Sequence, residues 1–196
     1  MNYLAHLLIA DQTNTSQLGN FLGDFVKGPV HEMDYHESIK QGIRLHRAVD
    51  VFTDNHALFK QSKSRISSAR RRYAGIIIDL AYDHFLSVHW SVFSSDPRQT
   101  FISDFYLALA KNSSWLPERC EAIAQPMISG DWIGNYAQLA GISASLNGIS
   151  RRIKRQFNRD NPLFNAVDEI ESNYQSIEAD FLAFFPLLSE HAKKVA

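Results

Sequence analysis

The chain has 196 residues, 45% of them hydrophobic, and a formal net charge of −1. That composition suits one globular domain with a sizeable core, and it excludes a disordered chain. A nearly neutral chain has no overall field to attract nucleic acid or an anionic membrane, so any site for an anionic partner must be a local patch.

Helical patterns dominate the chain, and neither alternating strand patterns nor Asn-Gly hairpins occur. Ser16 can cap the second predicted helix, Gly28-Pro29 can end it, Pro162 suits a first helical turn, and Pro186 predicts a kink. In chain order, the predicted helices cover about residues 2–10, 16–26, 35–53, 73–93, 98–111, 117–128, 131–140, 143–157 and 161 onward. We therefore predict one all-α domain over residues 1–196, with about seven to nine helices and a break near 53–54.

We expect a cytoplasmic protein without a membrane partner. The N-terminal segment MNYLAHLLIADQ lacks the basic start of a signal peptide, and His6 interrupts its short apolar run. No run approaches the roughly eighteen apolar residues that a membrane-spanning helix needs. The single cysteine, Cys120, excludes an internal disulfide and fits a reducing compartment.

Four predicted helices carry polar residues four positions apart on otherwise apolar segments. Side chains at this spacing share one helix face, with Cβ atoms about 5–6 Å apart. A buried carboxylate is costly unless an arginine, a shared proton or a metal ion compensates it. The pairs are Asn2 with His6, Asn20 with Asp24, His46 with Asp50, and Asp79 with Asp83; Asp54 continues the third pair, and His84 follows the fourth.

Imidazole and carboxylate together suit Mn, Fe, Zn or Mg, and helix bundles assemble such sites from facing helices. Each pair also has an ordinary explanation. His6 can be a satisfied core residue, Asp24 a cap or turn after Gly23, and His46 with Asp50 part of an exposed salt-bridge row. Because the pattern recurs within the first 84 residues, it favours a shared metal or acid–base site.

Basic residues gather in two short stretches of this neutral chain. A solvated helix face can explain either cluster, but their concentration favours an anionic partner. No recognised nucleic-acid motif accompanies them, whereas an acidic protein or a phosphate-bearing ligand fits. The residues are Arg70, Arg71 and Arg72 in the first cluster, and Arg151, Arg152, Lys154 and Arg155 in the second.

Four motifs, MNYLAHL, LGNFLGDFVKG, IKQGIRLHRAVDVFTDNH and RRRYAGIIIDLAYDHFL, the last followed by Trp90, resemble the acyl carrier protein phosphodiesterases. The likeness is detailed over about residues 1–93 and looser beyond, with small departures at Val49 and Ala57. That family is similar to the HD-type phosphohydrolases, which are all-helical and metal-dependent. The resemblance thus implies an HD-phosphohydrolase-like fold, although the His-Asp adjacency of that group is reversed here as Asp83-His84.

The resemblance implies hydrolysis of the phosphodiester that links 4′-phosphopantetheine to a serine of holo acyl carrier protein, an acidic protein suited to the basic clusters. Mn²⁺ is the implied ion, with Mg²⁺, Fe²⁺ or another divalent ion as alternatives. The predicted metal ligands are Asp24, His46, Asp50 and Asp79. The residues predicted to support the ligands or to move protons are His6, Asp83 and His84.

Two other functions stay open at this point. One is an HD-type phosphohydrolase that acts on a nucleotide or another small phosphoester. The other is a non-catalytic helical adaptor whose basic clusters capture an acidic protein, with the polar pairs serving as buried networks. A metal assay separates the adaptor from both enzymes, because only the enzymes need the ion for their chemistry.

Overall fold

A computed structural model describes residues 1–196 and contains twelve α-helices, three short 3₁₀ helices and no strand. Because every element is a helix, the all-α prediction is confirmed. Eight of the α-helices have seven or more residues. The elements are α1 (Tyr3–Gln12), α2 (Gln17–Leu22), η1 (Val30–Glu32), α3 (Glu37–Asn55), α4 (Ala57–Ser64), η2 (Ser68–Tyr73), α5 (Ala74–Val88), α6 (Trp90–Phe93), α7 (Arg98–Lys111), η3 (Ser113–Trp115), α8 (Glu118–Ser129), α9 (Trp132–Asn135), α10 (Leu139–Phe157), α11 (Val167–Ser172) and α12 (Tyr174–Val195).

Helix boundaries agree with the prediction best in the N-terminal half. Ser16 caps α2 by accepting a hydrogen bond from the Gly19 amide, and the break expected near 53–54 falls at His56, which caps α4. Two later boundaries are wrong. The helix expected over 131–140 is the short α9 followed by the start of α10, and the helix expected from 161 begins only at α11 and α12. The extended residue Gln138 (φ −122°, ψ 139°) separates α9 from α10, whereas the left-handed residue Asn165 (φ 57°) precedes α11.

The helices α1 and α5 lie at the centre of the molecule. Every residue of α1 from Leu4 to Ala10 is buried, and so is every residue of α5 from Leu80 to Ser87. An apolar surface on all sides is typical of a helix enclosed by other helices. Polar side chains on these two helices therefore cannot rely on water and must find partners inside the protein.

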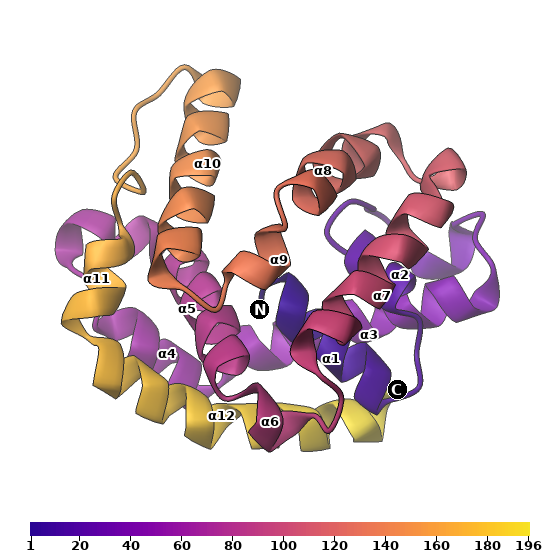
Figure 1. The fold of residues 1–196 in the computed structure, drawn as a ribbon, viewed down its shortest axis with the longest axis horizontal. Coiled ribbons are helices and arrows are strands. Elements are labelled where there is room, and N and C mark those ends of the chain that lie inside the picture. The colour runs from indigo at the N-terminus through magenta and orange to yellow at the C-terminus, as the bar shows by residue number, and fades with distance from the viewer.

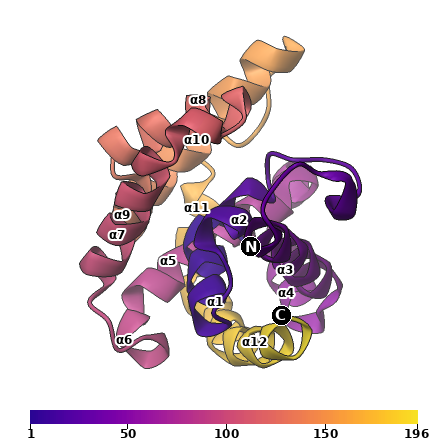
Figure 2. The same ribbon diagram turned by 90° about the vertical axis from the view of Figure 1, so that its right-hand side faces the viewer.

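The other helices enclose this centre. Helix α12 runs along one side and packs against α3, α4 and α5 (Figure 1). Helices α7, α8 and α10 gather on one side of the molecule, away from α3, α4 and α12 (Figure 2). A single hydrophobic core of 44 buried residues contains side chains from α1 through α12, so the chain forms one domain. No helix is both long and apolar enough to cross a lipid bilayer.

Two close contacts fix the helices that carry the candidate site. Helices α2 and α3 touch through Gly19 and Gly42: a Cβ on Gly19 would lie 2.4 Å from the Ile39 carbonyl oxygen, and one on Gly42 would lie 2.6 Å from that of Ser16. Only glycine allows the two backbones to approach so closely. The contact holds Asn20 and Asp24 beside the face of α3 that carries His46.

A buried carboxylate ties α12 to α4. Asp180 Oδ1 accepts from Gln61 Nε2 at 2.8 Å, and Asp180 Oδ2 accepts from Ser62 Oγ and from Arg65 Nε, each at 2.9 Å. The second guanidinium nitrogen of Arg65 lies 3.2 Å from Oδ1. Both oxygens are therefore fully used within the protein, and the cluster is a structural link between helices.

Candidate metal centre

Three side chains from α1 and α3 form a compact cluster. The ligand atoms of His6, His46 and Asp50 all lie within 4.8 Å of one another. Asp50 bridges the edges of the two rings, with Oδ1 3.1 Å from His6 Nε2 and Oδ2 3.1 Å from His46 Nε2. The rings stack with their centroids 4.1 Å apart. One carboxylate thus holds two imidazoles in a shared orientation, and the group could hold a metal ion.

Two further carboxylates border the cluster. Asp24 Oδ1 lies 3.6 Å from His46 Nε2. Asp79 Oδ1 lies 3.1 Å from the amino group of Met1, which is itself 3.5 Å from Asp50 Oδ1. The structure therefore brings together all four residues predicted as metal ligands, with His6 among them as a further candidate ligand. It also adds the Met1 amino group, a cation that the helical spacing argument missed.

Local sequence creates the room for the two rings. A Cβ on Gly23 would lie 2.2 Å from His46 Cγ, so only glycine at this position leaves space for the imidazole. On the other side, Asn20 Oδ1 lies 3.3 Å from His6 Nδ1 and orients that ring. Such an outer hydrogen bond is typical of histidines that bind metals through their second nitrogen.

The protonation states suit a cation. Burial, with the neighbouring His46, lowers the pKa of His6 to about 4 against the opposing pull of Asp50, so the ring is neutral at pH 7 and able to coordinate. Burial alone would raise the pKa of Asp50, but the hydrogen bonds from His46 and His6 outweigh it and hold this pKa well below the ordinary value. Asp50 is therefore a permanent negative charge that bridges the two rings.

The pKa values of the two bordering carboxylates, Asp24 and Asp79, are shifted in the opposite direction from that of Asp50. Burial raises the pKa of Asp24, against the opposing His46. Burial also raises the pKa of Asp79, against the opposing Met1 amino group. Nearby carboxylates raise both values further, because like charges repel. A divalent cation would relieve this repulsion.

Two buried polar atoms at the site have no hydrogen-bond partner, His46 Nδ1 and Asn20 Nδ2. Incomplete pairing of buried polar atoms is unusual in a folded protein and calls for a ligand or a functional explanation. The mixed set of imidazole and carboxylate donors is one that Mn, Fe, Zn or Mg accepts. The residues present therefore fit a divalent metal ion.

The structure does not bring Asp83 and His84 to this centre. Asp83 Oδ2 accepts from the Leu4 amide at 2.8 Å and Oδ1 accepts from the Ala5 amide at 3.1 Å, so this carboxylate caps α1. Burial raises the pKa of Asp83 to about 7, although the two backbone bonds oppose that shift. His84 Nδ1 lies 2.8 Å from the Tyr136 carbonyl oxygen, and its Nε2 lies 2.9 Å from the Tyr174 hydroxyl. Both side chains therefore connect helices.

The basic clusters divide into paired and free residues. Arg70 is held by Asp168, Glu169 and the Pro162 carbonyl oxygen. Lys154 pairs with Asp160 at 2.8 Å. Within the two clusters, the exposed arginines without an acidic partner are Arg71, Arg72, Arg151, Arg152 and Arg155. These five cluster residues leave their charge open to an anionic partner.

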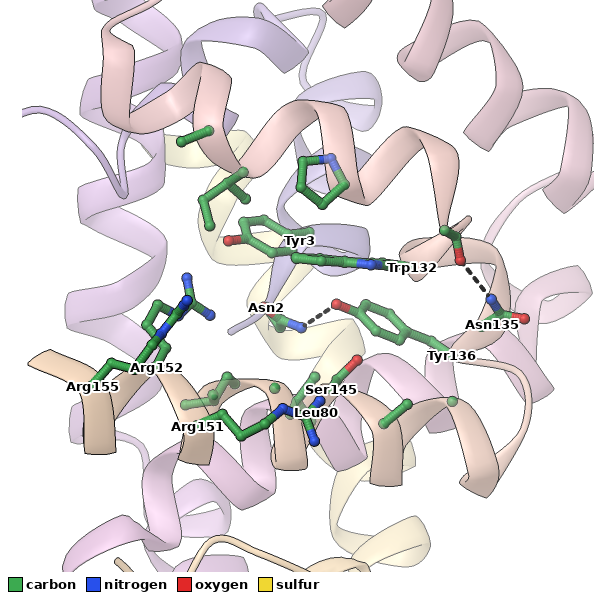
Figure 3. Close-up of a pocket in the computed structure, with 18 of the residues that line it drawn as sticks. Asn2, Tyr3, Leu80, Trp132, Asn135, Tyr136, Ser145, Arg151, Arg152 and Arg155 are labelled. Carbon is green, nitrogen blue, oxygen red and sulfur yellow. Dashed lines mark hydrogen bonds between the residues drawn. The ribbon is translucent and has the colours of Figure 1, made fainter. Parts of the chain in front are cut away.

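A cavity of about 990 Å³ adjoins the centre, between α8, α9 and α10. The start of α1 contributes Asn2 and Tyr3 to its wall, and Asn2 Nδ2 donates to the Tyr136 hydroxyl at 3.1 Å (Figure 3). Sequence reasoning missed this cavity and its residues Trp132 and Tyr136. Their spacing of four positions was the available signal, but the helix that carries them was predicted with the wrong boundaries.

These features define an all-α protein with a candidate metal centre of histidine and aspartate. The family model for acyl carrier protein phosphodiesterase matches residues 1–188. The chain is 34% identical to the acyl carrier protein phosphodiesterase of Photorhabdus laumondii, over 98% of this chain and 96% of the relative. It is 34% identical to that of Pectobacterium atrosepticum, over 98% of both. It is 32% identical to that of Escherichia coli O6:H1, over the full length of both. The chain belongs to the acyl carrier protein phosphodiesterase family. No solved structure matches it.

Proposed function

We propose that the protein is a metal-dependent phosphodiesterase that removes 4′-phosphopantetheine from holo acyl carrier protein. The observation that carries this proposal is the convergence of His6, His46 and Asp50 from two family motifs into one ligand group. The printed name of the relatives supplies the substrate class. The free arginines support an acidic protein substrate, because a carrier protein of negative charge would be steered toward them.

His6, His46 and Asp50 would hold the ion, with Asp24 and Asp79 at its border. Mn²⁺ is the proposed ion, and Mg²⁺ and Fe²⁺ are chemically compatible alternatives. When bound, such an ion neutralises the phosphodiester and makes water a better nucleophile near neutral pH. Asp50 lies 3.1 Å from Nε2 of each ring and so holds both rings facing one point, where these nitrogens and the carboxylate would take up the ion in place of their hydrogen bonds.

Asp24 is the group that we assign to proton transfer. Its side chain is 46% exposed, so it can contact both water and substrate, and burial raises its pKa, which makes the carboxylate a stronger base than an ordinary aspartate. In the reaction, a water oxygen bonds to phosphorus and the bond from phosphorus to the serine oxygen breaks. The Asp24 carboxylate accepts the proton of the water and then donates it to the serine oxygen, which leaves as a hydroxyl. The products are apo carrier protein and 4′-phosphopantetheine.

The likeness to HD-type phosphohydrolases stays a prediction. The all-α fold and the His/Asp ligand set support it, but the adjacent pair Asp83-His84 lies in helix contacts outside the centre. We also propose that the whole chain acts as one hydrolase domain, supported by its single core, and that it works in the cytoplasm, supported by its lone buried Cys120.

The test is incubation of holo carrier protein with the metal-loaded protein, read by intact mass. We expect loss of the phosphopantetheine mass with Mn²⁺ and none after chelation or with His46→Ala. Turnover of small phosphoesters alone would favour the nucleotide-type hydrolase. A folded protein that binds carrier protein and never changes its mass, with or without metal, would favour the adaptor.

A further inference from the structure

The cavity between α8, α9 and α10 begins beside the metal centre. Asn2 and Tyr3 line it, and they directly follow Met1, whose amino group contacts Asp50 and Asp79. Charges of both regions act on Tyr3. Burial raises the pKa of Tyr3, Asp24 at the metal centre raises it further, and Arg152 at the cavity opposes the increase. The first three residues of the chain therefore link the centre to the wall of this cavity.

The walls of the cavity combine three kinds of chemistry. Ile123 and Pro126 of α8, with the flat face of Trp132, supply apolar surface. The hydrogen-bonded pair Asn2 and Tyr136 supplies polar groups at the base. Arg151, Arg152 and Arg155 of α10 stand together at one end, apart from Trp132 and Tyr136 (Figure 3). The cavity thus offers cations at one end and mixed polar and apolar contacts along the rest.

We propose that this cavity binds the pantetheine arm of the substrate, an inference that rests on the proposed function. A pantetheine arm is a flexible chain with two amides, a pair of branching methyl groups and a terminal thiol, and in the substrate its other end carries the anionic phosphate. Its alternation of polar and apolar groups matches the alternation along the walls. At about 990 Å³, the volume is at the upper end of the range of small-molecule sites and accommodates an extended chain.

Helix α10 leaves room for the arm because the residues on its cavity-facing side have small side chains or none. Gly141, Ala144, Ser145 and Gly148 all line the cavity, and their spacing places them on one side of the helix. A Cβ on Gly148 would meet nothing within 4 Å. A methyl group at Gly148 would therefore meet no protein atom, and a larger side chain there would start from the wall of the cavity.

This geometry allows a graded test on the intact protein. We expect Gly148→Ala, Gly148→Leu and Gly148→Trp to raise KM for holo carrier protein in that order, by at least about tenfold for the tryptophan, with kcat little changed. Folding should survive, because glycine is the weaker helix former inside α10. The matched control is Gln156→Trp, which adds the same bulk to an exposed position of α10 outside the cavity.

Direct binding separates this inference from the proposed function. By calorimetry, free pantetheine should bind the wild-type protein and Gln156→Trp, and should not bind Gly148→Trp. If the wild-type protein never removes phosphopantetheine, the proposed function fails, while loss of pantetheine binding in Gly148→Trp still supports the cavity as its site. If turnover occurs and Gly148→Trp keeps the wild-type KM, the arm lies elsewhere and the inference is overturned. Absence of pantetheine binding to the wild-type protein would also overturn it.

Discussion

Asp180 and Asp50 are both carboxylates on long helices, yet they differ in whether the polar atoms around them all have hydrogen-bond partners. Each oxygen of Asp180 accepts hydrogen bonds from α4 and from Arg65, and nothing further is needed. Asp50 holds two imidazoles, and that cluster leaves His46 Nδ1 and Asn20 Nδ2 without partners. Complete pairing marks a link that serves the fold, whereas incomplete pairing marks a place that a ligand can complete. Four experiments can break or sharpen this distinction.

The largest effect is expected at the satisfied cluster. Asp180→Ala leaves Gln61, Ser62 and Arg65 without their shared acceptor, and the loss of one partner from a buried charged network costs about 3–5 kcal/mol. Urea unfolding should show this fall in the free energy of unfolding, while turnover per folded molecule stays unchanged. Asp160→Ala, which removes an exposed partner of Lys154, is the control and should leave stability unchanged. A specific loss of turnover in folded Asp180→Ala would break the distinction.

Asp83 provides a buried carboxylate with hydrogen bonds and no cation. Its pKa is about 7 in the folded protein against 3.8 ordinarily, so between these values the folded chain keeps a proton that the unfolded chain has lost. This group therefore contributes stability that falls as pH rises from about 4 to 7, by up to about 4 kcal/mol at about 1.4 kcal/mol for each pKa unit.

The measurement is urea unfolding of the wild-type protein and Asp83→Asn at several pH values without metal. The stability of wild type relative to the variant should be greatest near pH 4 and smallest above pH 7, because the amide does not ionise. A difference that does not change with pH would show that Asp83 stays ionised, held by the Leu4 and Ala5 amides.

The third experiment addresses the incomplete cluster. His46→Ala should lower turnover of holo carrier protein at least about a hundredfold, since losing even a supporting partner of a metal ligand costs about ten- to a hundredfold. It should also lower the bound metal measured by mass spectrometry and change the urea midpoint little. His31→Ala, at a side chain that is 77% exposed, is the matched control. A strong loss of stability with normal metal content would place His46 with Asp180 among the structural residues.

The smallest effect extends the comparison to the arginines. Arg71 and Arg72 are free, whereas neighbouring Arg70 is paired with Asp168 and Glu169. Reversing the charge of Arg71 and Arg72 should raise KM for carrier protein by about tenfold or less with kcat unchanged, because steering acts on association. The difference from wild type should shrink with added salt, given a Debye length of about 8 Å at physiological ionic strength. Arg70→Ala should lower the melting temperature instead. Equal effects of the two changes on KM would remove the distinction between paired and free arginines.

The sequence predicted the fold class and most of the N-terminal helices, because apolar periodicity and caps such as Ser16 are local signals. The predicted ligands also lie near one another, since His46 is close to Asp24 and Asp50 and the Met1 amino group links Asp79 to Asp50, while their role as ligands stays a prediction. These spacings define a helix face but do not say what the face meets, so the contact of Asp83 with α1 could not be predicted.

Long-range contacts were out of reach for the same reason. The hydrogen bond from Ser62 to Asp180 joins residues 118 positions apart, and the local sequence of either segment does not indicate that the two segments pack together. The cavity lies between α8, α9 and α10, and the left-handed residue Asp131 separates α8 from α9. Asp adopts that conformation only in a suitable context, so its effect on the helix boundary appears only in the folded chain.

A side chain at position 23 and the imidazole of His46 cannot both fit, so the residues at positions 23 and 46 can change only together. A methyl group at position 23 would occupy the space of the imidazole, 2.2 Å from Cγ. Alanine at 23 would therefore displace the imidazole of His46 although every candidate ligand is still present in the sequence. If such a centre evolves or is engineered on this fold, position 23 must become glycine before a histidine at position 46 can fit. Attempts to retune the centre for a different ion must choose both positions together.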